Sequence, residues 1–382
     1  MGTMSGKYVL QSSGYSAFYP NPLPPNPPVI VEGRLQEQLS KADRALGRLD
    51  GTTLVLPNPG LFVYMYIRKE AVLSSQIEGT RSSLQDVLTA EAKLLDPDRP
   101  GDVNEVINYI SAINHGLGRL ETLPVSTRLI REIHERLMHG VRGFHLTPGE
   151  LRKSQNWIGP GGCSLTEATF VPPPPDELPE LLGALEKFLH SDSTLPLLIR
   201  IGLAHAQFET IHPFLDGNGR MGRLLISLLL CERKVLSKPV LYLSYFFKSK
   251  RAEYYEKLQN IRDKGEWEEW LLFFLRGVEE VSYQASQAAR EIILLRERHR
   301  ELITATLLRS AGTALKVLES LYTNPITSVK EVQEVTGTSY PSANELVKSM
   351  EDMKILVEIT GRKRNRRYMY MDYVDLFRED LP

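Results

Sequence analysis

Three glycines stand at positions 217, 219 and 222, inside the run IHPFLDGNGRMGRLL of residues 211–225. Their G-x-G-x-x-G spacing matches a dinucleotide-binding loop, but that loop requires a buried strand leading into the first glycine. Residues 196–211 instead carry apolar side chains at helical spacing, and Pro196 suits a first helical turn. The run after the glycines, RLLISLLLCERK, is apolar nearly all round, which is typical of a helix buried inside a domain. The sequence therefore predicts a helix, a glycine-rich loop and a second helix, and it argues against a dinucleotide fold.

The charges beside the glycines point to an anionic ligand. Arg220 and Arg223 lie near the start of the second helix, where the helix macrodipole disfavours cations. Gly217 and Gly219 allow the backbone to present a concave row of N–H donors, and Asn218 adds an amide. A polyphosphate is the simplest ligand for this cradle, although the chain lacks the G-x-x-x-x-G-K-[ST] pattern of a P-loop.

Two other side chains of the loop can carry chemistry. Asp216 is a lone carboxylate beside the cradle, and proteins hold Mg²⁺ on phosphates with such a group. His212 is the only side chain of the loop that takes up a proton near neutral pH, so it is a candidate general base. A histidine considered alone is more often structural. For His212, the neighbouring Asp216, the glycines and two arginines favour the catalytic interpretation.

Composition places the chain among ordinary globular proteins. Its 382 residues are enough for two or three domains, and the formal net charge of −1 gives no general attraction to nucleic acid or anionic membranes. Only Cys163 and Cys231 are present, which fits a reducing compartment. The N-terminus has no apolar signal core, so we expect a cytoplasmic protein with no membrane partner.

Helical spacing dominates the rest of the chain. A proline-dense stretch, YPNPLPPNPPVIVEG, closes the first thirty or so residues and is expected to lie extended on the surface. Helices are expected near 32–50, 61–78, 83–95, 102–120, 126–139 and 176–190, and again over 241–300. Residues 153–175, with a Gly-Pro-Gly-Gly turn between two β-prone runs, predict a β-hairpin; the plainer alternative is a surface excursion.

The last eighty residues read as three helices followed by a β-hairpin, the order of a winged helix-turn-helix domain. The fold class expected is mainly α, with a helical core, a small β-hairpin and this C-terminal domain. The expected domains are an N-terminal region (1–100), a catalytic core (101–240), a helical connector (241–305) and a winged-helix domain (306–382).

The loop also carries a resemblance to a known family. HPFLDGNGR followed by MGR resembles the Fic motif H-x-F-x-[D/E]-G-N-G-R-x-x-R at every specified position. The resemblance implies transfer of AMP from ATP to a hydroxyl of a protein side chain, with Mg²⁺. It implies that His212 deprotonates the target hydroxyl, Asp216 holds Mg²⁺ and Phe214 anchors the loop in the core. It assigns the α- and β-phosphates to Asn218, Gly219 and Arg220, and the γ-phosphate to Arg223.

A second stretch, SSQIEG, places a carboxylate at an unfavourable helix end. Glu78 is expected to end a helix that Gly79 stops, and a helix C-terminus disfavours a negative charge unless a cation is near. The plain interpretation is a solvated surface glutamate. The stretch also matches the Fic inhibitory motif [S/T]-x-x-x-E-[G/N], with Ser74 and Glu78 one turn apart. That resemblance implies that Glu78 pairs with Arg223 and so denies the γ-phosphate its partner.

The family resemblance also gives the hairpin a role. It looks like the Fic flap, which aligns a target segment by main-chain pairing. The residues assigned to target docking are Gln155, Asn156, Trp157, Ile158 and Gly159. The target is a protein with a Ser, Thr or Tyr hydroxyl, self-modification included, and inhibitory helices of this kind suggest a homodimer.

Other functions stay open. The same loop could transfer another phosphate group or remove AMP. The alternative hypothesis is a DNA-binding regulator that senses ATP. It is supported by the expected wing, GRKRNRR, which is strongly basic. The expected recognition helix carries Glu345, Glu351 and Asp352, a poor charge balance for the major groove, so DNA is not the favoured partner.

Overall fold

The apolar residues at three-four spacing form helices in a computed structural model, which describes residues 4–54, 56, 59–94, 101–141 and 146–377. The fold is mainly helical, as the sequence predicts. The helices up to the glycine loop are α1 (Gly33–Leu54), α2 (Pro59–Ile77), α3 (Leu84–Glu91), α4 (Val103–Arg119), α5 (Thr127–Leu137), α6 (Leu178–His190) and α7 (Leu197–Ile211). After the loop follow α8 (Asn218–Glu232), α9 (Ser244–Ser249), α10 (Arg251–Lys264) and α11 (Trp267–Leu307).

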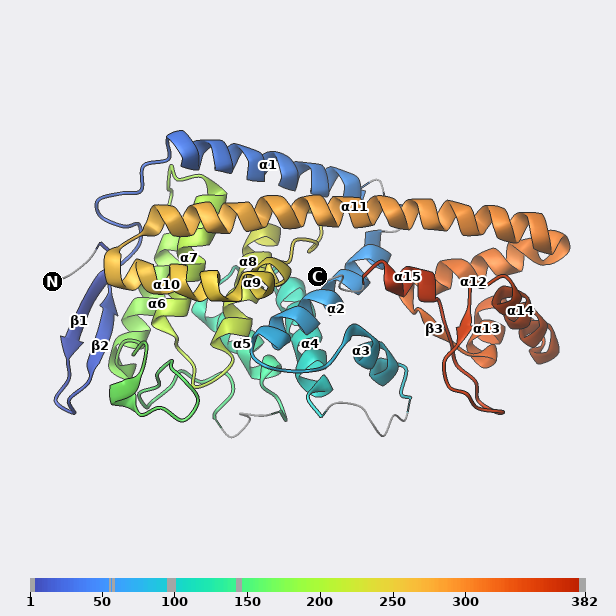
Figure 1. The fold of residues 1–382 in the computed structure, drawn as a ribbon, viewed down its shortest axis with the longest axis horizontal. Helices are drawn as coiled ribbons and strands as arrows, with labels where there is room; N and C mark the ends of the chain where they lie inside the picture. The colour runs from blue at the N-terminus through green and yellow to red at the C-terminus, as the bar shows by residue number, and fades with distance from the viewer. Residues whose placement is uncertain (1–3, 55, 57–58, 95–100, 142–145, 378–382) are drawn as a thin grey trace.

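Helix α11 runs almost the full length of the molecule, and α1 packs along it (Figure 1). Its first half buries Trp270, whose indole N–H donates to the Gly202 carbonyl oxygen in α7 at 2.9 Å. Its second half reaches the C-terminal helices. Because it touches both ends of the fold, α11 fixes the N-terminal and C-terminal segments relative to α7.

Helices α7 and α8 pack closely at the centre of the helical body. From Leu198 to Ile211 only Arg200 is not buried. Gly222 of α8 faces α7 so closely that an added Cβ would clash with a carboxylate oxygen of Glu209, and it would lie 3.3 Å from Phe208 Cδ1. His205 of α7 connects the two helices, because its Nδ1 lies 3.0 Å from the Gly222 carbonyl oxygen in α8. Its Nε2 lies 2.9 Å from Tyr254 Oη in α10. The third glycine of the loop pattern therefore serves helix packing.

A β-hairpin near the N-terminus was not anticipated from the sequence. Strands β1 (Gly6–Leu10) and β2 (Ser16–Pro20) pair antiparallel, with Gly6 opposite Pro20. Phe18 is fully buried, and its N–H donates to the Val171 carbonyl oxygen at 2.9 Å. Part of the first thirty residues thus belongs to the core. The sequence did not predict this hairpin, because five-residue strands give too short a pattern to distinguish from the proline-rich segment after them. Residues 21–32 form neither helix nor strand.

The hairpin expected at 153–175 is much reduced. Its antiparallel pairing within the chain is a single bridge between Ile158 and Phe170, with N···O distances of 2.8 and 3.0 Å. A short 3₁₀ helix, Leu165–Glu167, occupies the stretch between them. The Glu167 side chain accepts hydrogen bonds from the backbone N–H and the hydroxyl of Ser164, which stabilises this turn. Hydrogen bonds of this kind replace the further strand pairing that a longer hairpin would have.

The C-terminal segment contains helices α12 (Ala311–Thr323), α13 (Val329–Thr336), α14 (Tyr340–Asp352) and α15 (Met371–Asp375). Its strands β3 (Ile326–Thr327), β4 (Val357–Glu358) and β5 (Tyr368–Met369) form a sheet in the order β3-β5-β4. The assignment as a winged-helix domain stays a prediction. The domain boundaries also stay predictions. The buried residues from Leu35 to Phe377 form one continuous core, which marks no boundary between domains.

Within the described residues, no helix is long and apolar enough to cross a membrane.

The close packing at Gly222 gives a stability prediction. We expect Gly222→Ala to lower the free energy of unfolding by about 1–3 kcal/mol, because the new methyl group overpacks the contact with Glu209. The matched control is Gly47→Ala in α1, where an added Cβ meets no heavy atom within 4 Å. That change is expected to stabilise by about 0.4–1 kcal/mol. Denaturant unfolding of both variants measures the difference, and equal effects at the two sites would contradict it.

Candidate functional site

His212 stands where α7 ends. It adopts the left-handed conformation, with φ 49° and ψ 60°, which is costly for a residue other than glycine and turns the chain sharply into the loop. Its Nδ1 lies 3.4 Å from the Glu209 carbonyl oxygen, which can only accept a hydrogen bond. Nδ1 therefore carries the proton, and Nε2 keeps the lone pair that a base requires. Burial and the guanidinium groups of Arg262 and Arg152 lower the pKa of His212 to about 3.

Side chains tie the loop to its own backbone. Asn218 accepts from the Phe214 N–H at 2.9 Å and donates to the Phe214 carbonyl oxygen at 2.8 Å. The Phe214 ring is fully buried and stacks on His134, with ring centroids 3.7 Å apart. His134 Nδ1 accepts from the Gly149 N–H at 2.9 Å, so its Nε2 donates to the Asp216 carbonyl oxygen at 2.9 Å. The Asn218 amide is thus occupied by the loop, and the contact that it can still offer a phosphate is its backbone N–H.

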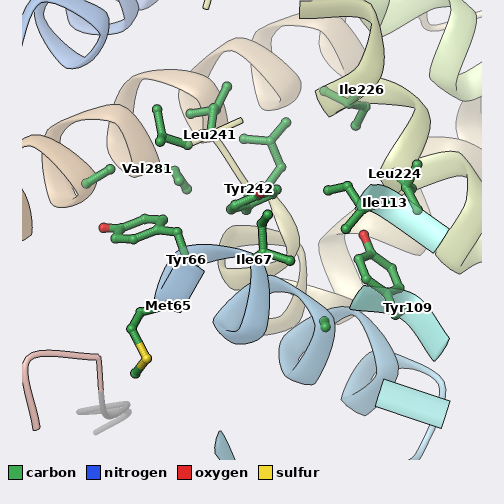
Figure 2. Close-up of a cluster of buried hydrophobic side chains, with 14 of the residues drawn as sticks. Met65, Tyr66, Ile67, Tyr109, Ile113, Leu224, Ile226, Leu241, Tyr242 and Val281 are labelled. Carbon is green, nitrogen blue, oxygen red and sulfur yellow. The ribbon is translucent and has the colours of Figure 1, made fainter. Parts of the chain in front are cut away.

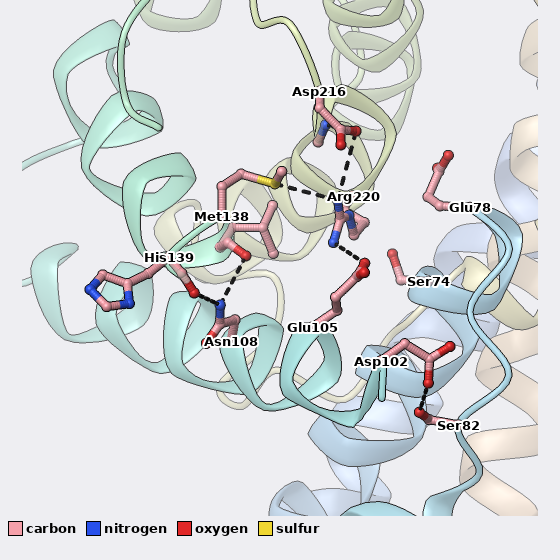
Figure 3. A network of polar contacts seen from close by, with 12 residues as sticks. Ser74, Glu78, Ser82, Asp102, Glu105, Asn108, Met138, His139, Asp216 and Arg220 are labelled. Carbon is pink, nitrogen blue, oxygen red and sulfur yellow. Dashed lines mark hydrogen bonds and ion pairs between the residues drawn. The ribbon is translucent and has the colours of Figure 1, made fainter. Parts of the chain in front are cut away.

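Arg220 and Asp216 face each other across the start of α8. The buried Arg220 guanidinium donates from Nη1 to Glu105 Oε2 at 3.0 Å, and its Nη2 lies 3.8 Å from Asp216 Oδ1 (Figure 3). Asp216 Oδ1 also accepts from the Gly217 N–H at 2.6 Å. The side chain of Asp216 is 39% exposed, and among the described residues its Oδ2 has no hydrogen bond. One carboxylate oxygen is therefore available to a cation at the mouth of the loop.

Arg223 is buried at the site as deeply as Arg220, and the end of α2 and the residue after it supply its partners. Its Nε donates to Ser74 Oγ at 2.9 Å, and its Nη2 donates to the Ser74 carbonyl oxygen at 2.9 Å and to Glu78 Oε1 at 2.6 Å. The Arg223 side chain is 1% exposed, against 32% for Glu78. Burial alone would lower the pKa of Arg223 and raise that of Glu78, but their mutual attraction moves both pKa values the other way.

The end of α2 carries the glutamate to that position. The Gly79 N–H donates to the Gln76 carbonyl oxygen at 3.0 Å and the Thr80 N–H to the Ser75 carbonyl oxygen at 3.3 Å, which together make a Schellman motif with Gly79 at φ 98°. A Cβ added at Gly219 would clash with Glu78 Oε1. The Glu78 carboxylate therefore covers the N-terminus of α8, which is where a helix favours an anion.

Of the residues assigned to target docking, Asn156 reaches the loop through its side chain. Asn156 Nδ2 donates to the Phe214 carbonyl oxygen at 2.8 Å, and Gln155 Nε2 donates to the Pro172 carbonyl oxygen at 2.9 Å. Trp157 is 42% exposed, and its indole N–H donates to the Cys163 carbonyl oxygen at 3.1 Å. Gly159 lies so close to Cys163 that a Cβ would sit 2.6 Å from its sulfur. The structure thus brings Asn156 to the loop and leaves Trp157 facing outward.

Three residues that support the site were not singled out from the sequence. Arg152 donates from Nε to the His212 carbonyl oxygen at 3.0 Å, Glu105 pairs with Arg220, and Arg262 donates to the Glu209 carbonyl oxygen at 3.3 Å. Arg262 also stacks on the flap residue Phe170, 3.7 Å from the ring centroid. Each lies far from the loop in sequence. A charged residue that folding buries looks the same in sequence as one on the surface, so no local signal marks them.

One arginine of the basic segment 361–367 is neutralised within the chain. Arg367 donates from Nη1 to both carboxylate oxygens of Glu331 in α13, at 2.7 and 2.8 Å. Arg366 Nε donates to the Arg362 carbonyl oxygen at 3.1 Å. The ion pair with Glu331 reduces the positive charge that this segment would offer to a phosphate backbone, whereas the hydrogen bond of Arg366 to a carbonyl leaves its charge unchanged.

Comparison with known proteins identifies the segments around the loop. Residues 36–118 match the pattern described as Fic/DOC family N-terminal, and residues 124–230 match the Fic/DOC family. Over 182 residues, 46% of this chain, a probable protein adenylyltransferase of Aquifex aeolicus is 31% identical. Over 186 residues, the protein adenylyltransferase Fic of Drosophila erecta is 30% identical. The matched segments span 51% and 32% of the lengths of these relatives.

Solved structures extend the comparison to the fold. A Fic family protein from Desulfovibrio desulfuricans superposes with a TM-score of 0.58 at 19% identity, covering 90% of this chain and 97% of that one. A Fic domain containing signaling protein from Bacteroides thetaiotaomicron reaches a TM-score of 0.52 at 17% identity, covering 68% and 97%. The loop, α7 and all but the last two residues of α8 thus lie within the segment 124–230 that matches the Fic/DOC family, and the segment 36–118 before it matches the Fic/DOC N-terminal family.

Proposed function

We propose that the chain is a protein adenylyltransferase, which transfers AMP from ATP to a hydroxyl side chain of a target protein. The observation that carries the proposal is the geometry of the loop. It places a neutral imidazole with its lone pair on Nε2 at one end and the N-terminus of α8, with buried Arg220 and Arg223, at the other. The protein adenylyltransferases matched at about 30% identity support the same activity.

The proposed reaction uses one base and one leaving group. The target hydroxyl oxygen forms a bond to the α-phosphorus of ATP, and the bond from that phosphorus to the oxygen bridging to the β-phosphate breaks. The hydroxyl proton moves to His212 Nε2, and pyrophosphate leaves. Because transfer of this kind depends mainly on alignment and on neutralising charge, the rigid loop and the end of α8 contribute more than covalent chemistry would.

The phosphates and the metal fit the donors that are present. The start of α8 exposes the N–H groups with which a helix favours an anion, and the buried Arg220 and Arg223 lie in the first two turns of the same helix. Asp216 has an exposed carboxylate with one oxygen not engaged by the described residues, which suits Mg²⁺ shared with phosphate oxygens. When bound, Mg²⁺ would neutralise charge on the phosphates.

Glu78 is proposed to hold this site in an inhibited state. Its carboxylate takes the Arg223 contact that the γ-phosphate would otherwise make, and it lies over Gly219. ATP would then bind without the alignment that transfer needs. Main-chain pairing of the target with residues 155–159, a homodimer and DNA binding through the C-terminal segment stay predictions.

The inhibition can be tested by substitution. We expect Glu78→Gly to raise the rate of AMP transfer about tenfold to hundredfold at saturating ATP and Mg²⁺, because it releases a charge-assisted contact on Arg223. Adding His212→Ala in that background should lower the rate by at least about a hundredfold. Intact-protein mass, with a gain of AMP units, measures both effects.

The control is Glu91→Gly. Glu91 ends helix α3 and pairs with the buried Arg68 at 2.7 Å, so this change breaks a similar ion pair away from the loop. Equal activation by Glu91→Gly and Glu78→Gly would mean that loosening the N-terminal domain suffices, and it would overturn the specific role of Glu78.

The lowered pKa of His212 gives a second prediction. Since folding lowers that pKa from its ordinary value of 6.5 to about 3, we expect the imidazole to stay neutral, and able to accept a proton, at pH 5. Nitrogen chemical shifts of the histidines, with His212→Gln to assign the signal, measure the titration in the nucleotide-free chain. A midpoint at or above pH 6.5 would contradict the lowered pKa of this base.

A further inference from the structure

A cavity of about 650 Å³ is lined in part by helix α2 and is separate from the glycine loop. Its walls come from α2, from Tyr242 and Tyr245, and from residues 281–291 of α11. None of residues 212–223 lines it. This volume is within the range of small-molecule sites.

Two polar groups in the cavity wall lack partners. Glu70 is 1% exposed, and its Oε1 accepts from Tyr109 Oη at 3.1 Å and Ser244 Oγ at 2.5 Å. Its Oε2 has no partner in the described part of the chain, and neither has the hydroxyl of Tyr242. Burial raises the pKa of Glu70 to about 7, although the hydrogen bonds from Ser244 and Tyr109 and the charge of Arg223 act in the opposite direction. A buried polar atom without a partner is costly, so both atoms favour a ligand that supplies one.

The rest of the cavity defines the shape and charge of that ligand. The rings of Tyr66 and Tyr242 stack with centroids 6.4 Å apart, and Val281 faces them from α11 (Figure 2). These apolar surfaces suit a flat ring. Arg48 and Arg290 line the cavity from exposed positions on α1 and α11, Lys69 adds a third positive charge from α2, and Glu291 adds a negative charge from α11.

We propose that this cavity is a regulatory site for a small planar molecule with an N–H donor at one end and an acidic group at the other. The donor binds Glu70 Oε2, the ring lies against the tyrosines, and the acid meets Arg48 and Arg290.

The position of Glu70 connects the cavity to the inhibitory contact, and this step rests on the proposed function. Glu70 and Ser74 lie four residues apart on α2, and Glu78 follows after four more, directly past the last residue of the helix, so the three lie along one side. Ser74 and Glu78 hold Arg223. A ligand that binds Glu70 in this arrangement stabilises α2 where Glu78 covers α8, and it therefore strengthens the inhibition.

Binding is tested with 4-aminobenzoate as the probe and benzoate, which lacks the donor, as its control. Titration calorimetry or ligand-observed NMR on the full chain should show 4-aminobenzoate binding about tenfold more tightly. Glu70→Gln should abolish that preference, because its amide presents a donor in place of Oε2. Arg290→Gln, at an exposed position that folding tolerates, should weaken both probes about equally. Equal affinity of the two probes for the unchanged chain, or no saturable binding of either, would overturn the site.

Regulation is tested separately by AMP transfer. Saturating 4-aminobenzoate should lower transfer by the unchanged chain and leave that of Glu78→Gly unaltered. Binding without this difference would overturn the regulatory role and keep the site. Absence of AMP transfer in every variant would count against the proposed function, while the binding result would stand on its own.

Discussion

The ion pair between Arg223 and Glu78 sets the arrangement of the site. A guanidinium that is 1% exposed, near the start of a helix, requires anionic partners, because burial and the helix macrodipole both act against its charge. Glu78, directly after α2, supplies the anion, and Ser74 of α2 supplies two neutral hydrogen-bond acceptors, so α2 must end beside α8. The Schellman motif at Gly79 ends α2 at that place. An anion that displaced Glu78 would meet the same arginine and the same helix end, so one position can serve both inhibition and binding.

The three glycines that resemble a dinucleotide loop have separate physical roles. Gly217 takes a left-handed conformation, with φ 80°, against His134 and Met138. Gly219 leaves room for the Glu78 carboxylate, and Gly222 lets α7 and α8 approach. Together with the contacts between Asn218 and Phe214, they hold His212 and the start of α8 in a fixed relation. That fixed relation is what a reaction dependent on alignment needs.

Local patterns in the sequence were sufficient for the helices and the loop, because the helices follow from apolar spacing. Local charge alone left Glu78 as a solvated glutamate, and only the resemblance to the Fic inhibitory motif implied its contact with Arg223. The sequence did not reveal the β1–β2 hairpin, the limited bridge between Ile158 and Phe170, or the positions of Arg152, Glu105 and Glu70. These features depend on contacts between segments distant in sequence. A buried carboxylate such as Glu70 has no local mark that separates it from a solvated one.

The most direct test of the central claim is the affinity for ATP and for ADP, measured by calorimetry with Mg²⁺ in chains that carry His212→Ala to prevent transfer. If Glu78 occupies the place of the γ-phosphate on Arg223, the chain with Glu78 should bind the two nucleotides with similar affinity. Its Glu78→Gly counterpart should then bind ATP about tenfold or more tightly than ADP. The same ratio of ATP to ADP affinity in both chains would contradict the account.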